Sequence, residues 1–244
     1  MWLKNNIPNM ITSMNLLCGC MSVMAVANNE TDVAGLFIFL AAGFDFLDGM
    51  AARLLNARTD IGKQLDSLAD MVSFGLAPGL IMFHLISQAA EIGYPQSSLA
   101  TNLPYLALAI PVLSAWRLAI FNVDVRQEDR FIGLPTPANA MLLASIPMIM
   151  AYQIHFSSNI VHSILGFMFN PFILALLSLI MSILLVANIP LFALKFKDFS
   201  WVRNKIRYTF IAAALILFAL LQFTAVPVII LLYVLFSILW REKA

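Results

Sequence analysis

Long apolar runs are the feature that most constrains the fold of this chain. Each is close to the length of about 20 apolar residues that crosses the hydrocarbon core of a bilayer. The runs cover residues 10–27, 33–55, 61–87, 103–121, 136–152, 160–187, 207–223 and 226–241. Backbone in lipid must satisfy its hydrogen bonds internally, and segments of this length do so as helices. We therefore predict an all-α integral membrane protein, a polytopic bundle of about eight transmembrane helices.

The composition agrees with this prediction. Of the 244 residues, 61% are hydrophobic and 11% are charged, whereas a soluble domain carries about 25% charged residues. The net charge of +1 gives no indication of nucleic-acid binding. We expect one transmembrane domain over residues 1–244 and no soluble domain.

The first apolar run has two interpretations. Lys4 precedes it, and residues 25–27 resemble the cleavage site of a secretory signal peptide. Against this, Thr12, Asn15 and Gly19 recur at helical spacing and form a polar stripe that a signal peptide does not need. We therefore expect a retained first span.

The basic residues all fall on one side of this topology. The turns at 28–32, 88–102, 153–162 and 224–225 contain no Lys or Arg, so all 14 basic residues lie on the opposite side. The positive-inside rule makes that side cytoplasmic. We expect a cytoplasmic-membrane protein with both termini in the cytoplasm.

Four carboxylates interrupt the second and third apolar runs, at Asp45, Asp48, Asp66 and Asp70. Ionised side chains are costly in a membrane and usually functional there. Asp45 and Asp48 share one helical face, and Asp66 and Asp70 share another, so a short turn would bring the two faces together. Facing carboxylates repel one another unless cations lie between them. The acids lie at the cytoplasmic ends of their spans.

Two explanations are open for these acids. They could form buried ion pairs with Arg53 and Lys63, although two basic residues cannot neutralise four acids. Alternatively, cations lie between them, and the small residues Gly49, Ala52 and Gly62 leave room for a ligand. We favour bound cations, because the two basic residues are too few for the four acids.

The same residues resemble the signature of the CDP-alcohol phosphotransferase family. The pattern D-x2-D-G-x2-A-R-x8-G-x3-D-x3-D is present at every position of residues 45–70. The resemblance implies that family's fold, and displacement of CMP from a CDP-linked lipid by an alcohol. It also implies a homodimer and two metal ions, Mg²⁺ or Mn²⁺, held by the four acids. By the same resemblance, Gly49, Ala52, Arg53 and Gly62 would bind the CDP-lipid, and Asp70 would also take the proton of the attacking hydroxyl.

Further strings resemble the phosphatidylserine synthase branch of this family. They are P-N-x2-T-x2-N at 8–15, VSFGLAPG at 72–79, RLAIFN at 117–122 and FIGLPTPANA at 131–140. The branch implies CDP-diacylglycerol and L-serine as substrates, with Arg117 and Asn122 near the serine carboxylate. Ile120 stands where the branch usually has a second Arg. The resemblance covers about residues 7–140, so we expect a catalytic core near 7–152 and additional spans at 160–241.

Three alternatives stay open. Arg117 could be a membrane-edge anchor. The acceptor could be another alcohol, such as glycerol phosphate or inositol, because it is set outside the acidic motif. A divalent-cation transporter would also place acids in a membrane, but near the midplane and in two matching halves. Here the acids gather on one side, and no second half mirrors them.

Overall fold

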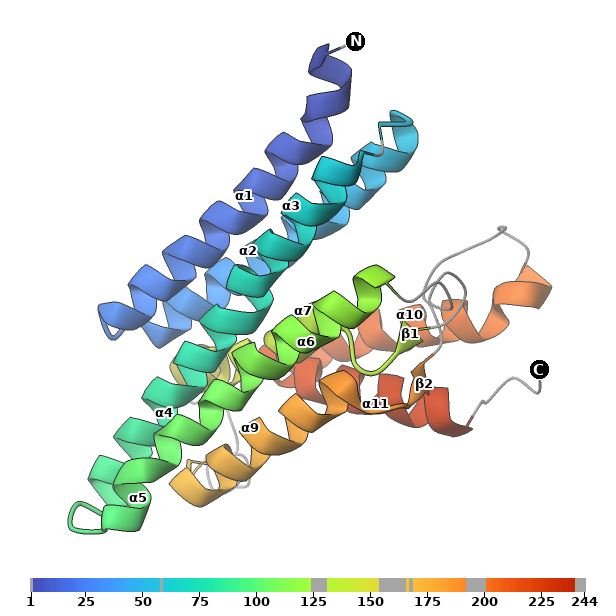
Figure 1. Ribbon diagram of the computed structural model, residues 1–244. Coiled ribbons are helices and arrows are strands. Elements are labelled where there is room, and N and C mark those ends of the chain that lie inside the picture. The colour runs from blue at the N-terminus through green and yellow to red at the C-terminus, as the bar shows by residue number, and fades with distance from the viewer. Residues whose placement is uncertain are drawn as a thin grey trace.

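The computed structural model describes residues 2–57, 59–123, 131–153, 166, 169–191 and 201–239. Helices make up nearly all of this part of the chain, and they pack side by side as an elongated bundle (Figure 1). The α-helices are α1 (Trp2–Ala27), α2 (Thr31–Leu54), α3 (Asp60–Asp70), α4 (Ala77–Gly93), α5 (Ser98–Asn102), α6 (Ala109–Val123), α7 (Thr136–Met148), α9 (Pro171–Val186), α10 (Trp201–Leu221) and α11 (Ala225–Leu239). Shorter π and 3₁₀ stretches extend or join them at η1 (Met71–Leu76), η2 (Leu103–Leu108), η4 (Ile149–Gln153) and η6 (Gln222–Thr224).

These elements confirm the polytopic helical membrane fold. Several of these elements are continuous in the chain and form longer helical segments. They are α3–η1–α4, α5–η2–α6 and α7–η4. Each predicted apolar run thus has a helical counterpart in the described residues. Five segments are long and apolar enough to cross a membrane, and Pro171–Val186 is a shorter apolar helix. The five are Asn6–Ala27, Thr31–Leu54, Asp60–Gly93, Ser98–Val123 and Tyr208–Ser237.

The last of these segments folds back on itself. The ring centroid of Phe210 on α10 lies 5.8 Å from that of Tyr233 on α11. A straight helix would separate these residues by about 35 Å. The chain turns at η6, where Gln222 has a φ of 50°. The prediction of two C-terminal helices is therefore confirmed, with the turn just before Pro227.

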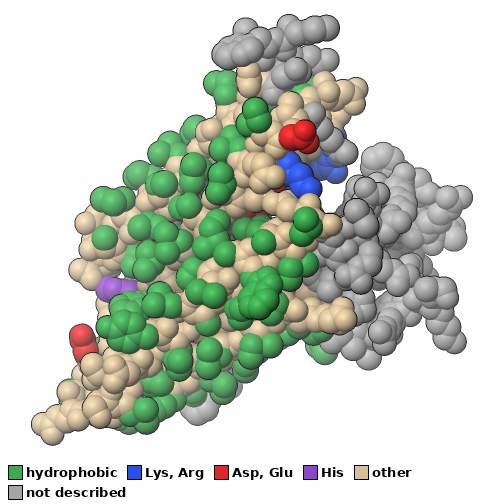
Figure 2. Space-filling model, viewed as in Figure 1, with side chains coloured by type: hydrophobic (Ala, Val, Ile, Leu, Met, Phe, Trp, Pro, Cys, Tyr) green, Lys and Arg blue, Asp and Glu red, His purple; other side chains and the backbone are tan. Residues whose placement is uncertain are grey.

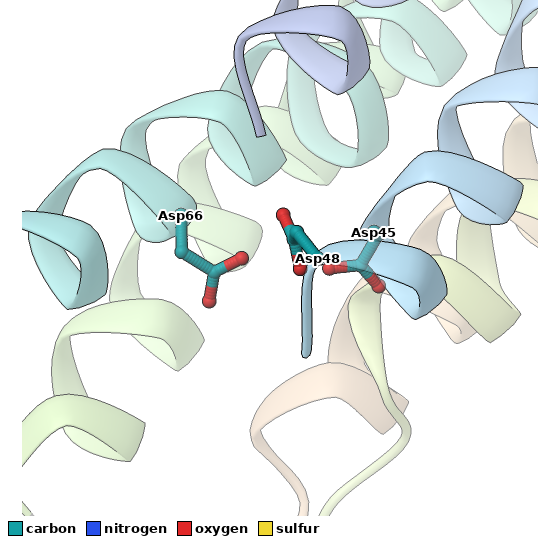
Figure 3. Close-up of side chains that lie close together, drawn as sticks. All are labelled: Asp45, Asp48 and Asp66. Atoms are coloured by element: carbon teal, nitrogen blue, oxygen red, sulfur yellow. The ribbon is translucent and has the colours of Figure 1, made fainter. Parts of the chain in front are cut away.

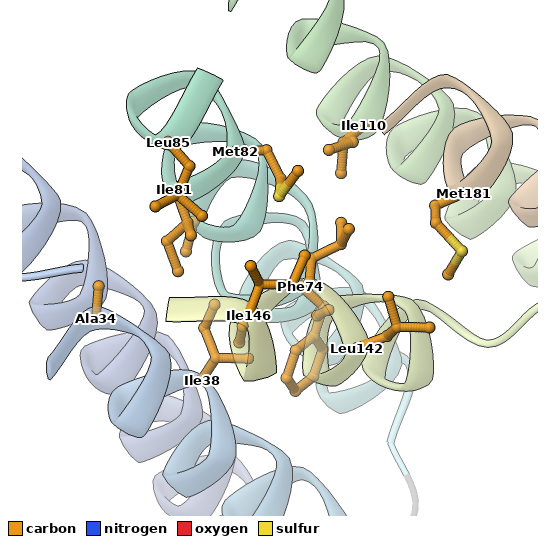
Figure 4. Packing of buried hydrophobic residues seen from close by; sticks show 14 of the residues in the cluster. Ala34, Ile38, Phe74, Ile81, Met82, Leu85, Ile110, Leu142, Ile146 and Met181 are labelled. Atoms are coloured by element: carbon orange, nitrogen blue, oxygen red, sulfur yellow. The ribbon is translucent and has the colours of Figure 1, made fainter. Parts of the chain in front are cut away.

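The helices pack around one apolar cluster. Figure 4 shows Ile38 of α2, Phe74 of η1, Ile81 of α4 and Leu142 of α7 meeting at its centre. The cluster also includes residues of α1, α6, α9, α10 and α11. Because lipid is as apolar as these side chains, helices in a membrane associate through close packing. Gly35 illustrates this, since a Cβ there would lie 2.8 Å from the carbonyl oxygen of Ala144.

Contacts between neighbours set the direction of each helix. Asn9 of α1 approaches Gly62 of α3, and Gly19 further along α1 abuts Ser73 of η1, so α1 runs parallel to the continuous helix formed by α3, η1 and α4. Thr12 bonds to Asp48 of α2 whereas Ser22 bonds to the carbonyl of Ala34 at 2.8 Å, so α1 and α2 are antiparallel. Three of the described stretches next to turns without basic residues meet at one end, where the Tyr152 hydroxyl donates to Asp32 at 3.1 Å and its ring lies near that of Phe223.

The surface repeats this polarity. Apolar side chains cover the long face shown in Figure 2, over α1, α4 and α6. The Lys and Arg side chains visible on that face gather near the turn between α2 and α3. This is the end of the bundle that carries the acidic motif.

A small β-ladder, absent from the all-α prediction, joins the loop before α7 to the end of α9. Strands β1 (Phe131–Ile132) and β2 (Pro190–Leu191) pair antiparallel, with Phe131 opposite Leu191. Gly133 follows with a φ of 77°, and a Cβ there would collide with the carbonyl oxygen of Leu185. Only glycine meets both conditions without strain.

Candidate metal centre

The turn between α2 and α3 places the acidic faces opposite each other. Asn56 has a φ of 48°, a left-handed conformation that Asn tolerates better than most residues. Thr59 then caps α3, because its Oγ1 accepts a hydrogen bond of 3.0 Å from the backbone N–H of Gly62. The chain reverses within a few residues, so side chains some twenty positions apart meet.

Three carboxylates converge where the two helices face each other. One oxygen from each of Asp45, Asp48 and Asp66 lies within 4.8 Å of the others. Figure 3 shows Asp66 on α3 pointing toward Asp45 and Asp48 on α2. Asp48 is only 6% exposed, so its charge is largely removed from water. Three negative charges this close require a cation between them or protonation.

The basic residues of the motif do not supply that cation. The Nε of Arg53 donates to the carbonyl oxygen of Gly49 at 2.9 Å, and the Nζ of Lys63 donates to the carbonyl oxygen of Asn122 at 2.8 Å. Within the described residues, neither forms an ion pair with these acids. The alternative in which Arg53 and Lys63 form ion pairs with the acids is therefore not supported by the described contacts. The all-oxygen donor set suits a hard divalent cation.

Asp70 lies one turn beyond Asp66 and has different partners. Its Oδ1 accepts a hydrogen bond of 3.1 Å from the Nδ2 of Asn15, and its side chain is 8% exposed. It is not one of the three acids whose oxygens lie within 4.8 Å of one another. It is close enough to Asp45, Asp66 and Arg117 to interact with their charges.

Helix α1 contributes contacts that the sequence reasoning did not assign. Thr12 donates from Oγ1 to Oδ2 of Asp48 at 2.6 Å, and Asn15 reaches both Asp70 and Ser73. Asn9 approaches Gly62, where a Cβ would lie 2.9 Å from the Asn9 side-chain oxygen. The P-N-x2-T-x2-N string thus touches both acidic helices with its three polar residues. The helical spacing of these polar residues predicts that they share one face of α1. It does not predict that this face meets the acidic helices.

The small residues of the motif have different surroundings. A Cβ on Gly49 would meet no described atom within 4 Å, so the face of α2 is open there. Ala52 is half-buried one turn further along this face. Gly62 is instead packed against Asn9 and Thr59. Of the two glycines, Gly49 has the open space that a ligand needs.

Arg117 and Asn122 occupy two different places along α6. Arg117 is 7% exposed, and its Nη1 donates to Oγ1 of Thr136 at 3.3 Å. Asn122 donates from Nδ2 to Oγ of Ser67 at 2.8 Å, beside the Lys63 contact. Arg117 therefore lies deep near Asp70, whereas Asn122 ties α6 to the start of α3. A surface anchor would not be buried in this way.

Comparison with known proteins agrees with this geometry. The sequence profile of CDP-alcohol phosphatidyltransferases matches residues 5–240. The chain belongs to the CDP-alcohol phosphatidyltransferase family. The match extends well beyond the resemblance seen over residues 7–140, so the C-terminal helices belong to the family pattern too.

Named relatives within this family are similar over most of the chain. A CDP-diacylglycerol–serine O-phosphatidyltransferase of Bacillus subtilis is 34% identical over 189 residues, covering 76% of this chain and 89% of the relative. One from Helicobacter pylori strain J99 is 31% identical over 186 residues, covering 75% and 70%. An archaetidylserine synthase of Methanothermobacter thermautotrophicus is 32% identical over 142 residues, covering 57% and 56%.

Proposed function

We propose that this CDP-alcohol phosphatidyltransferase transfers the phosphatidyl group of CDP-diacylglycerol to the hydroxyl of L-serine, giving phosphatidylserine and CMP. The observation that carries the proposal is the convergence of Asp45, Asp48 and Asp66 from two helices. The names of the relatives supply serine as the acceptor.

The reaction exchanges one phosphate ester for another. A bond forms between the serine hydroxyl oxygen and the phosphatidyl phosphorus, and the bond from that phosphorus to the bridging oxygen of CMP breaks. The hydroxyl proton must leave, and CMP leaves with the electron pair of the broken bond. Such transfers depend on alignment and charge neutralisation more than on covalent catalysis.

The four acids are our candidates for metal binding. Asp45, Asp48 and Asp66, with Asp70 on the next turn, would hold two ions of Mg²⁺ or Mn²⁺. When bound, these ions would neutralise the diphosphate and stabilise CMP as the leaving group. Thr12 donates to Oδ2 of Asp48 and would help to hold this carboxylate toward Asp45 and Asp66. We assign Asp70 the further role of accepting the serine proton.

The remaining motif residues are our candidates for substrate binding. Gly49 and Ala52 would let the nucleotide approach α2, and Arg53 beside them would bind phosphate through its guanidinium. Gly62 would hold α1 close to α3 beside the CDP-lipid. Arg117 would bind the serine carboxylate in a bidentate contact. Asn122 would support the acceptor side by fixing α6 against α3.

The placement of the site also supports an orientation. The acidic end carries the basic side chains Arg53 and Lys63. The opposite end, around Asp32, Tyr152 and Phe223, adjoins turns whose sequences contain no Lys or Arg. By the positive-inside rule we propose that the site faces the cytoplasm, with both termini on that side of the cytoplasmic membrane. We also propose one transmembrane domain and a homodimer, the latter on the family resemblance.

The test is an acceptor panel with purified protein in detergent. CDP-diacylglycerol, Mn²⁺ or Mg²⁺ and labelled serine, glycerol phosphate, inositol or ethanolamine are assayed for CMP and for lipid product. We expect phosphatidylserine as the main product, and loss of CMP release in Asp48→Asn and Asp66→Asn. Asp60→Asn, on the exposed first turn of α3, is the matched control and should stay active. A different preferred alcohol would refute the serine assignment, and activity after metal stripping and EDTA would refute the metal role.

A further inference from the structure

Helices α6 and α7 carry buried polar groups without hydrogen-bond partners, and one of them belongs to Arg117, which interacts with the charge of Asp70. This cluster comprises Oγ of Ser114 and Nε of Arg117 on α6, and both side-chain polar atoms of Asn139 on α7, none of which has a partner within the described structure. Ser114 and Asn139 are 0% exposed, and Arg117 is 7% exposed. Buried polar groups are almost always paired, so several adjacent exceptions call for an explanation.

The directions of α6 and α7 bring these groups to one level. Along α6, Pro111 abuts Gly79, Ser114 abuts Gly75, and Asn122 meets Ser67, so α6 runs toward the acidic end. Helix α7 runs the opposite way, because Thr136 meets Arg117 whereas the following Tyr152 meets Asp32 at the far end.

The register of the two helices follows from the Arg117–Thr136 contact. Ser114 is three residues before Arg117, and Asn139 is three residues after Thr136. On antiparallel helices both therefore lie one turn deeper in the bundle than the Arg117–Thr136 pair. The neighbouring rod carries Asp70 on the side of the metal centre and Gly75 beside Ser114. The cluster is thus the continuation of the site away from the acidic end.

The unpaired atoms indicate which chemical groups a bound ligand would carry. The Nε of Arg117, the hydroxyl of Ser114 and the Nδ2 of Asn139 are donors, which suits a carboxylate. The Oδ1 of Asn139 is an acceptor, which suits an ammonium group. An α-amino acid carries both groups on one carbon, and its β-hydroxyl could then reach back toward Asp70. A fully ionised phosphate has no donor for the Asn139 oxygen, and a neutral polyol has no anionic group for the Arg117 guanidinium.

We propose that Ser114 and Asn139, together with Arg117, form the binding site for the α-amino and α-carboxylate groups of the acceptor, and that Asn139 selects an amino acid over other alcohols. This rests on the proposed function. It adds two specificity-determining residues on α6 and α7 that the acidic motif does not contain. The competing explanation is that the cluster holds only structural water.

The experiment compares Asn139→Ala and Ser114→Ala with Ser145→Ala. Ser145 is also buried on α7, but its hydroxyl already donates to the carbonyl of Leu142 at 2.6 Å, so it is the matched control. KM and kcat are measured for serine and for CDP-diacylglycerol, with ethanolamine and 3-hydroxypropionate as acceptors that lack the carboxylate or the ammonium. The acceptor panel on the unaltered protein is run first, so a failure of the serine assignment is seen separately.

In Asn139→Ala we expect the KM for serine to rise about tenfold or more, the effect of losing a hydrogen bond to a charged group. The KM for CDP-diacylglycerol should stay unchanged, and the preference for serine over the two analogues should narrow. Ser114→Ala should shift the same constants in the same direction by less, which covers the case in which Asn139→Ala does not fold. A serine KM within twofold of the unaltered protein in both variants would overturn the proposal in favour of structural water.

Discussion

Thr12 on α1 donates a hydrogen bond of 2.6 Å from Oγ1 to Oδ2 of Asp48 on α2, across 36 positions of sequence. The bond is buried, and it restricts the orientations that the Asp48 carboxylate can take. Thr12 also lies 3.0 Å from the carbonyl of Pro8, but its single proton is better used on a charged acceptor. Thr12 is therefore in a position to orient Asp48 toward Asp45 and Asp66.

We predict that Thr12→Val raises the metal concentration needed for half-maximal activity by about tenfold or more, as loss of an orienting hydrogen bond to a ligand does. Valine keeps the shape and removes the donor. Thr12→Ser should restore most of the affinity, because it returns the hydroxyl. Ser13→Ala is the control, since Ser13 is exposed and, within the described part of the chain, its hydroxyl bonds only to the carbonyl of Asn9 in its own helix. An unchanged Mn²⁺ titration for Thr12→Val would show that Asp48 needs no such support.

The glycines of the acidic motif give a second prediction, because their surroundings differ. An added Cβ meets nothing described within 4 Å at Gly49, but lies 2.9 Å from the Asn9 oxygen at Gly62. Gly49→Ala should keep or raise the melting temperature, since Ala favours helix by up to about 1 kcal/mol. It should nevertheless raise the KM for CDP-diacylglycerol several-fold. Gly62→Ala should lower the melting temperature, because Asn9 must move.

Gly43→Ala is the matched control for this comparison. Gly43 also lies on α2 with nothing described within 4 Å, but outside the acidic motif. It should gain stability like Gly49→Ala and leave the KM for CDP-diacylglycerol unchanged. If Gly49→Ala and Gly43→Ala behave alike in both measurements, the open face at Gly49 is not a substrate surface.

The acidic group could be predicted from sequence because its geometry is local. Asp45 and Asp48 share a helical face by their spacing, and a turn too short for another element brings Asp66 opposite them. The long apolar runs likewise determine where helices form, since lipid leaves the backbone few alternatives. Neither inference requires knowledge of which distant helix lies beside which.

The contacts made by α1 and α6 could not be predicted in that way. The helical spacing of Thr12 and Asn15 can be recognised in the sequence. Their partners cannot, because these depend on how α1 packs against α2 and α3. Lys63 donates to the backbone carbonyl of Asn122, and a sequence pattern of side chains cannot predict a bond to the backbone. The β1–β2 pair joins two residues to two others nearly sixty positions away. Strands of two residues are too short for the alternation of apolar and polar side chains that predicts a strand.

Topology gives a third prediction. The turns at Asn29 and Gln96 should lie on one side of the membrane and the turn at Asn56 on the other. In a background with Cys18 and Cys20 replaced, single cysteines at Asn29 and Gln96 should react with an impermeant thiol reagent added outside intact cells. A cysteine at Asn56 should react only after the membrane is opened. Labelling of Asn56 in intact cells with protection of Gln96 would reverse the orientation and place the acidic site outside.

A cysteine introduced at Ser158, which lies outside the described residues, should also react with the reagent added outside intact cells. Cys20 must be removed because it is exposed on α1, whereas Cys18 is buried. The different exposures of these two residues agree with the helical geometry expected from their spacing.

Asp70 carries the last prediction, because two roles are possible for it. Its Oδ1 is occupied by the Asn15 amide at 3.1 Å, and it stands apart from the three carboxylates that lie within 4.8 Å of one another. The serine hydroxyl is a poor nucleophile until it loses its proton, and Asp70 lies between the candidate metal centre and the proposed Ser114–Arg117–Asn139 site. A carboxylate beside metal is a weak base, but it can accept a proton late, as the oxygen–phosphorus bond forms and the hydroxyl becomes acidic.

We predict that Asp70→Asn retains binding of CDP-diacylglycerol, measured with labelled lipid in detergent, and loses turnover by about 10²-fold or more. The amide keeps the size of the side chain and cannot take the proton. If Asp70 served only as a metal ligand, lipid binding and turnover would fall together, and excess metal would recover part of the rate. Asp60→Asn on the same helix should alter neither quantity. Recovery of Asp70→Asn to near the unaltered turnover at high Mn²⁺ would remove the proton-accepting role and leave Asp70 as a ligand.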